Sequence, residues 1–137
     1  MNRLPDWLPR LQRLMARRWR QPFEWGVNDC ATLACDAVLA MTGVDLATDL
    51  RGRYGSREEA RGILGVTFED YCVRIASEHG LVEAPWRELH RGDLGFLDTQ
   101  DGGALGIVWP EGKLAFPGAR QAELVPVRMA HRGWRIG

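Results

Sequence analysis

The chain has 137 residues, of which 45% are hydrophobic and 26% charged, and its formal net charge is zero. This length and composition predict one globular domain over residues 1–137, and the balanced charge argues against a dedicated nucleic-acid binder. No apolar run reaches the roughly 18 residues that a membrane-spanning helix needs, and no apolar segment follows the first arginines as a secretory signal would require.

The three cysteines, at positions 30, 35 and 72, cannot all pair with one another. Their spacing matches neither a CxxC motif nor a set of zinc ligands. We therefore expect reduced thiols, no metal and no other cofactor, in a protein made in the cytosol.

The charge is unevenly spread along the chain. Residues 1–22 hold six arginines against one aspartate, a net charge of +5 that leaves −5 for the remainder. Apolar residues from Leu4 to Met15 recur at helical spacing and predict an amphipathic helix over about residues 6–19. A second face of this helix carries Arg10, Arg13, Arg17 and Arg20. We interpret that face either as solvated surface or as a docking surface for an acidic partner or phosphate; membrane binding ranks third, because the apolar stripe is of the ordinary core-packing kind.

Capping signals predict three further helices. One begins near Asn28 or Asp29, both good N-caps, and ends by Gly43. Another begins at the capping box Ser56–Glu59, and the last spans Thr67–Gly80.

After Pro85 the pattern changes to short apolar or β-branched segments separated by Gly, Pro and Asp. These segments are Leu94–Leu97, Leu105–Trp109, Leu114–Phe116, Leu124–Arg128 and Trp134–Ile136. Helices first and strands second predict an α+β fold, with N-terminal helices packed on a small C-terminal antiparallel sheet.

Cys30 is the candidate nucleophile, because it opens the predicted second helix directly after Asp29. A helix N-terminus favours a thiolate, and its free N–H groups can stabilise an oxyanion. The alternative interpretation is structural, since Cys30 also lies on the apolar stripe of its helix, and buried cysteine is a common core residue. Cys35 and Cys72 are interpreted as structural.

Three motifs in order resemble the NlpC-type cysteine peptidases, which are papain-like. WGVNDCATLACDAVLAMTG is similar to their nucleophile helix, RGDLGFL to their Gly-Asp-Leu strand, and ALGIVW to the following His-Val-Gly-Ile strand. The closest resemblance is to small NlpC-like proteins of phage tails and gene-transfer agents, which share the Phe-x-Trp-Gly-x-x-Asp-Cys start, an Arg-Gly-x-Tyr segment and a C-terminal Trp-Arg-Ile. The resemblance implies an NlpC-type α+β fold with Cys30 in the nucleophile position.

The chain departs from that pattern where the family has its catalytic base, a histidine. Ala104 occupies this position and cannot accept a proton. A positioned base contributes about 10²–10⁴-fold to a rate, so we expect an inefficient or inactive enzyme. The other histidines, His79, His90 and His131, fall elsewhere in the motif order. Asp93 is interpreted as a turn residue that bonds local backbone.

The resemblance implies a structural component of a phage-like tail tip or baseplate, made in the cytoplasm of the bacterial host. Its partners would be hub, tail-fibre or tip proteins, reached through Arg10, Arg13, Arg17, Arg20 and Trp134, because Arg and Trp often anchor interfaces. Two alternatives stay open. Cys30 would cleave peptidoglycan stem peptides during genome entry, with a base from another residue or subunit, or the protein would be an assembly factor absent from the finished particle.

Overall fold

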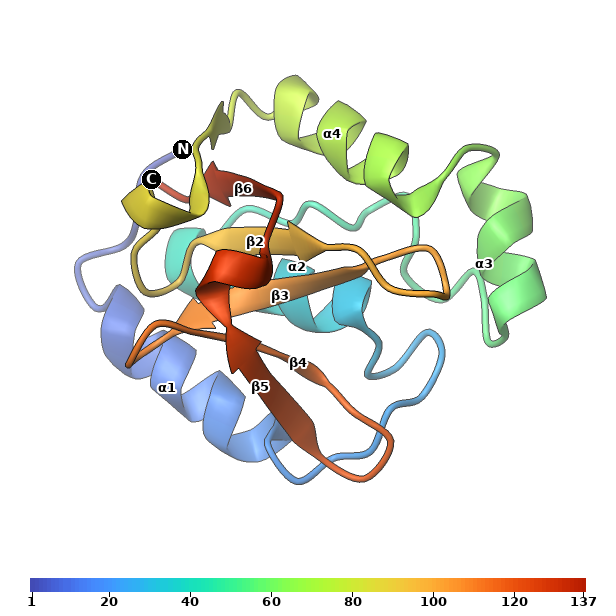
Figure 1. Ribbon diagram of the computed structural model, residues 1–137, viewed down its shortest axis with the longest axis horizontal. Helices are drawn as coiled ribbons and strands as arrows, with labels where there is room; N and C mark the ends of the chain where they lie inside the picture. Colours follow the sequence, from blue (N-terminus) through green and yellow to red (C-terminus); the bar gives the residue numbers. More distant parts are fainter.

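The computed structural model describes all 137 residues, with four α-helices preceding all the strands of a six-stranded sheet (Figure 1). The helices are α1 (Trp7–Arg18), α2 (Cys30–Thr42), α3 (Arg57–Leu64) and α4 (Phe68–Glu78). None of them is both long and apolar enough to cross a membrane. The strands are β1 (Val82–Glu83), β2 (Leu94–Leu97), β3 (Ala104–Trp109), β4 (Lys113–Pro117), β5 (Ala122–Pro126) and β6 (Arg132–Arg135).

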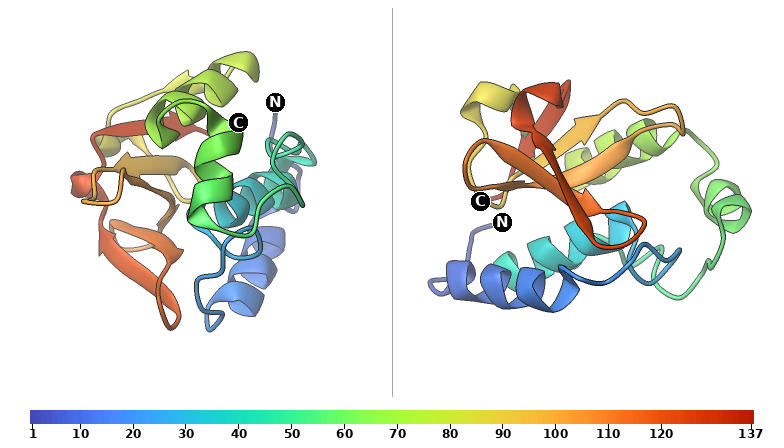
Figure 2. Two further views of the ribbon diagram at one scale, coloured as in Figure 1. Left: turned by 90° about the vertical axis from the view of Figure 1, so that its right-hand side faces the viewer. Right: turned by 60° about the horizontal axis from the view of Figure 1, so that its bottom comes forward.

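The strands pair antiparallel throughout, in the order β1-β6-β2-β3-β4-β5. Helices α1 and α2 lie side by side against one face of this sheet, and α3 stands apart beside the turn that joins β2 to β3 (Figures 1 and 2). The predicted α+β arrangement, helices packed on a small antiparallel sheet, is therefore confirmed.

Helices α2, α3 and α4 begin where their capping residues predict. Asp29 caps α2: its Oδ1 accepts a hydrogen bond from the Thr32 backbone N–H (2.8 Å), and Thr32 Oγ1 accepts one from the Asp29 N–H (2.9 Å). Ser56 and Thr67 cap α3 and α4 through a single bond each, accepted by the side-chain oxygen from the third following backbone N–H. Gly43 ends α2 with a φ of 80°, a conformation that glycine adopts without steric cost.

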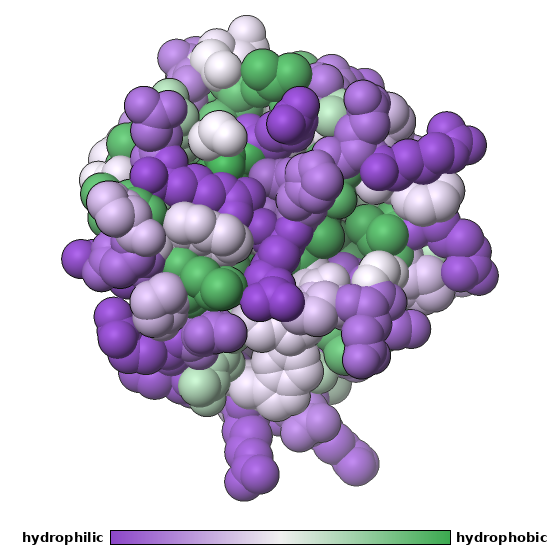
Figure 3. All heavy atoms as spheres, turned by 90° about the vertical axis from the view of Figure 1, so that its left-hand side faces the viewer, coloured by the Kyte–Doolittle hydropathy of each residue, from purple (hydrophilic) through white to green (hydrophobic).

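The main core lies between the sheet and helices α1, α2 and α4, and a smaller one covers the opposite sheet face. Successive strand residues divide between the two, since side chains alternate across a sheet. Phe96 and Ile107 point into the main core, whereas their neighbours Leu97 and Val108 join the smaller one. The left-hand side of the molecule is covered mostly by hydrophilic side chains, with hydrophobic ones scattered among them (Figure 3).

The strand boundaries depart from the sequence prediction in three places. The two-residue β1, which pairs with β6, is too short to carry a periodic pattern. β5 covers Ala122–Pro126 rather than Leu124–Arg128, because the chain turns into a 3-10 helix at Val127–Met129. β6 begins at Arg132, two residues before the predicted start.

A buried ion pair fixes the N-terminus to the end of the chain. Asp93 Oδ1 accepts hydrogen bonds from Arg3 Nη2 (2.9 Å) and from the Ile136 N–H (2.8 Å), and its Oδ2 accepts one from the His90 N–H (2.7 Å). The His90 bond is the local turn bond expected of Asp93. The same carboxylate thus holds the turn into β2 and both chain termini.

Candidate active site

The N-terminus of α2 and the first residue of β3 meet at a cleft of about 760 Å³. Cys30, the first residue of α2, and Ala104, the first residue of β3, both line it. The backbone of Leu105, the residue after Ala104, acts to lower the pKa of the Cys30 thiol, so the thiol lies near the start of β3. The structure therefore brings together the two positions that the motif order pairs.

The Cys30 thiol is held in its protonated form. The residue is half-buried, and burial of the thiol raises its pKa to about 12, with the negative charge of Asp29 acting in the same direction. Backbone N–H groups, that of Leu105 foremost, oppose this shift without cancelling it. Burial outweighs the helix N-terminus, whose partial positive charge would favour a thiolate.

Asp29 is engaged in structure rather than free to act as a base. Besides capping α2, its Oδ2 accepts hydrogen bonds from the Gly26 N–H (2.8 Å) and from the Tyr54 hydroxyl (2.5 Å). Burial first, and the bond to Asp29 second, raise the pKa of Tyr54 well above its usual value, so this hydroxyl stays protonated too. The buried Asp29 thus joins the loop before α2 to the segment before α3.

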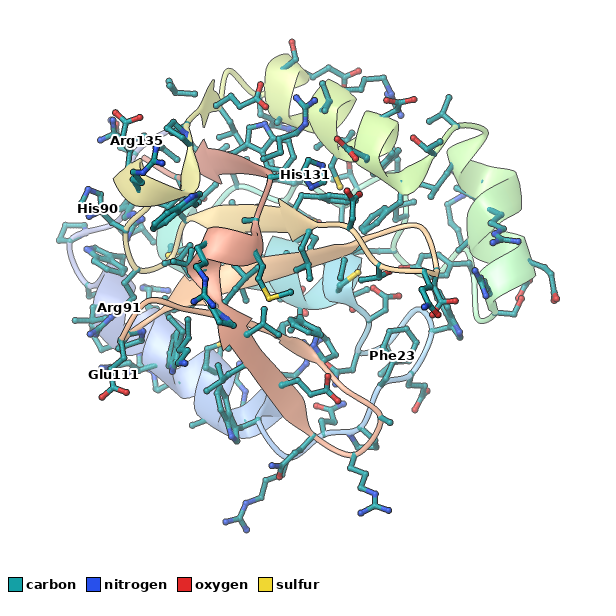
Figure 4. All side chains as sticks on the ribbon, in the orientation of Figure 1. Phe23, His90, Arg91, Glu111, His131 and Arg135 are labelled. Carbon is teal, nitrogen blue, oxygen red and sulfur yellow. The ribbon has the colours of Figure 1, made fainter.

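None of the three histidines lines the cleft. His79 ends α4, with its Nδ1 3.0 Å from the Ile75 carbonyl oxygen. His90 is exposed at the entry to β2, on the opposite side of the molecule from Phe23, which lines the cleft (Figure 4). His131 lies beside α4, its Nε2 3.0 Å from Glu69 Oε2.

Glu69, Asp98 and His131 place potential metal-ligand atoms within 4.8 Å of one another, and none of the three lines the cleft. Hydrogen bonds from His131 and then Arg132 lower the pKa of Glu69. The Arg132 guanidinium, 3.1 Å from the same Glu69 oxygen, already neutralises this carboxylate and opposes a cation there.

The two other cysteines lie among the core residues. Cys72 is buried and Cys35 half-buried, and neither is in a disulfide. Burial raises the pKa of Cys35 to about 12 and that of Cys72 well above its usual value. Such thiols are protonated and inert at neutral pH.

The predicted contact residues divide between surface and core. The four predicted contact arginines are all exposed: Arg10, Arg13 and Arg17 lie on α1, and Arg20 lies in the turn after it, because the helix ends at Arg18. Trp134, in contrast, is only 3% exposed and packs within the main core. Its side chain lies on β6 between β1 and β2, where it has no free surface to offer a partner.

The sequence prediction missed the walls of the cleft. One wall is formed by α3, and another by the loop before α2 and the end of β4. The cleft-facing residues of α3 recur at helical spacing: Arg57, Ala60, Arg61 and Leu64. This i, i+3, i+4, i+7 pattern was the available signal, although the sequence does not reveal what the stripe faces.

The fold and the cleft define an NlpC/p60-type, papain-like peptidase fold. The crystal structure of the NlpC/p60 domain of the peptidoglycan hydrolase SagA superposes with a TM-score of 0.56 at 15% sequence identity, covering 92% of this chain and 96% of that domain. The chain itself belongs to the family described as a domain of unknown function, DUF6950, whose model matches residues 2–136. No curated protein matches the sequence.

Proposed function

We propose that this protein uses an NlpC-type fold without hydrolytic activity, as a structural component of a phage-like tail tip or baseplate. The observation that carries the loss of activity is the cleft itself, which holds Cys30 and Ala104 but no imidazole. A thiol with a pKa of about 12 is ionised in only about one molecule in 10⁵ at neutral pH.

The missing base also removes the proton carrier that hydrolysis needs. In thiol-based hydrolysis the base accepts the thiol proton and later returns one to the leaving amine. Asp29 is saturated by donors, Tyr54 is held protonated, and Ala104 has no ionisable group. None of these three groups can therefore make either transfer.

The tail setting rests on the sequence motifs, from Phe23 through Cys30, Arg51–Tyr54 and Trp134–Ile136, that resemble phage-tail and gene-transfer-agent proteins. The candidate docking surface for an acidic tail protein is formed by Arg10, Arg13 and Arg17 of α1 and by Arg20 in the turn that follows it. Arg10 pairs with Asp6 across one helical turn, an exposed contact of little energetic weight. The other three arginines have no ion pair within the chain and remain free for an acidic partner.

An incorporation assay tests this proposal. Particles are purified after complementation with the wild-type chain or with the triple variant Arg13→Glu, Arg17→Glu, Arg20→Glu, and the protein is detected by immunoblot and immunogold labelling. We expect wild-type protein at the tail tip and loss of the triple variant. The control Arg128→Glu reverses an exposed arginine outside α1 and should be incorporated normally. Wild-type protein absent from finished particles would instead support an assembly factor.

The alternative function is a cysteine peptidase that cleaves peptidoglycan stem peptides during genome entry. It is favoured by one observation: Cys30 lines an open cleft that a substrate can enter. A neighbouring subunit would then have to supply the base. Cleavage of purified peptidoglycan by assembled particles, abolished by Cys30→Ser, would establish this alternative and overturn the inactive assignment.

A further inference from the structure

Helix α3 presents a stripe of side chains that the chain itself covers only in part. No residue of α3 is fully buried, and the stripe combines two arginines with two apolar residues. Its Arg57, Ala60, Arg61 and Leu64 line the cleft. A helix of eight residues has little stability of its own and gains it by burying one face, so the stripe is suited to covering something in the cleft.

A second wall of the cleft is aromatic. Phe23 and Trp25, in the loop before α2, meet edge to face with ring centroids 4.9 Å apart, and Phe116 at the end of β4 joins them. Trp25 remains 36% exposed. Twelve of the 22 lining residues are hydrophobic, and a volume of about 760 Å³ is in the usual range of small-molecule sites.

The charge available to a ligand in this cleft is positive. Arg61 has no ion pair within the chain, and Arg57 makes two long contacts with Asp101: its Nη1 lies 3.8 Å from Oδ1, and its Nη2 donates to the backbone carbonyl oxygen at 3.4 Å. The Asp101 side chain is 82% exposed, so solvent screens its charge. The other lining carboxylate, Asp29, is buried and bonded to three donors. An anionic group is therefore favoured on the α3 side.

An alkyl chain suits the remaining surface better than an extended peptide. A peptide strand normally pairs with a free sheet edge, but β3, which contributes Ala104, is paired on both sides by β2 and β4. Peptide amides left unpaired against the apolar walls would each be penalised. A hydrocarbon chain has no such groups.

We propose that the cleft binds an acyl-chain carboxylate, with the alkyl chain between α3 and the aromatic wall and the carboxylate against Arg61 and Arg57. This inference rests on the proposed function in one respect: a cleft without hydrolytic activity can keep a ligand bound rather than turn it over. Ligand binding would bury the α3 stripe.

Titration of the full-length, ¹⁵N-labelled protein with decanoate tests the inference. We expect saturable chemical-shift changes at Phe23, Trp25 and α3, and weaker binding of decyltrimethylammonium, which has the same chain with the opposite charge. Arg61→Gln should weaken decanoate binding about fivefold, whereas Arg128→Gln, at an exposed residue that does not line the cleft, should leave it unchanged.

Three results would overturn the inference: no saturable shift at the cleft, equal binding of the cationic amphiphile, or decanoate affinity unaffected by Arg61→Gln. These results are independent of the thiol measurement. A protein that fails to bind decanoate but keeps an unreactive Cys30 loses the acyl-carboxylate inference and retains the proposed function. A reactive Cys30 with peptidoglycan cleavage removes the proposed function whatever decanoate does.

Discussion

Cys30, the first residue of α2, and Ala104, the first residue of β3, line the same cleft. The two positions that the NlpC motif pattern assigns to nucleophile and base therefore both lie where α2 meets β3. The proposed absence of activity rests on one side chain, that of residue 104.

Replacement of Ala104 by histidine should make the Cys30 thiol more reactive. Ala104 is half-buried at the cleft wall, so a larger side chain has room there. An imidazole near Cys30 would lower the pKa of the thiol and raise its alkylation rate by iodoacetamide at pH 7 by about tenfold or more. Ala104→Asn adds a polar side chain without a base and serves as the control. Equal alkylation rates in both variants would show that a side chain at position 104 does not reach the Cys30 thiol.

Loss of the Asp93 carboxylate should destabilise the whole chain. Asp93→Ala leaves Arg3 and the Ile136 and His90 N–H groups without their acceptor, in a buried site. We expect the free energy of unfolding to fall by about 3–5 kcal/mol in urea titrations. Asp6→Ala removes the exposed pair with Arg10 and should change stability little. Similar losses of unfolding free energy in the two variants would contradict the role of Asp93 in holding both chain termini.

Gly26 is the position where the cleft loop tolerates no side chain. Its φ is 78°, and a Cβ would collide with the Tyr54 carbonyl oxygen. Gly26→Ala should therefore destabilise the protein by about 2–3 kcal/mol, measured by urea or thermal unfolding. Gly43→Ala has a similar φ of 80° but open space around the Cβ, so about 1 kcal/mol is expected. The difference between the variants measures the collision with Tyr54.

Stability should decline at alkaline pH. Burial raises the pKa values of Cys30 and Cys35 to about 12 from the ordinary 9.0, so the unfolded state loses these protons before the folded state does. The contribution of the neutral thiols is complete below pH 9 and is lost as pH rises from 9 toward 12. The double variant Cys30→Ala, Cys35→Ala should show a shallower decline in the free energy of unfolding. An unchanged slope would mean that other groups, such as Tyr71, carry the effect.

Local signals in the sequence predicted the helices well. Asp29, Ser56 and Thr67 cap their own helices through bonds to the third residue following each of them, so a short window contains the whole cause. The same holds for Cys30, whose place at the start of α2 follows from Asp29. Relations of this range need no knowledge of the tertiary fold.

Local signals could not predict the contacts between segments that are distant in the sequence. Arg3 and Asp93 are 90 residues apart, and nothing near Arg3 predicts its partner. Trp134 is of a residue type that often anchors interfaces. However, β1 and β2 flank its strand, and its ring packs in the main core. The cleft likewise forms where α3, the Phe23–Trp25 loop and β4 converge. The burial that raises the Cys30 pKa is a property of this assembly rather than of the helix start.

The central claim is that Cys30 lacks an activating base, and its alkylation rate as a function of pH tests this most directly. The rate is measured in the isolated chain and in purified particles, with Cys30→Ser subtracting the contribution of Cys35 and Cys72. We expect a slow reaction whose apparent pKa lies near 12 in both states. An apparent pKa below about 7.5 in either state, with peptidoglycan cleavage lost in Cys30→Ser, would contradict the account.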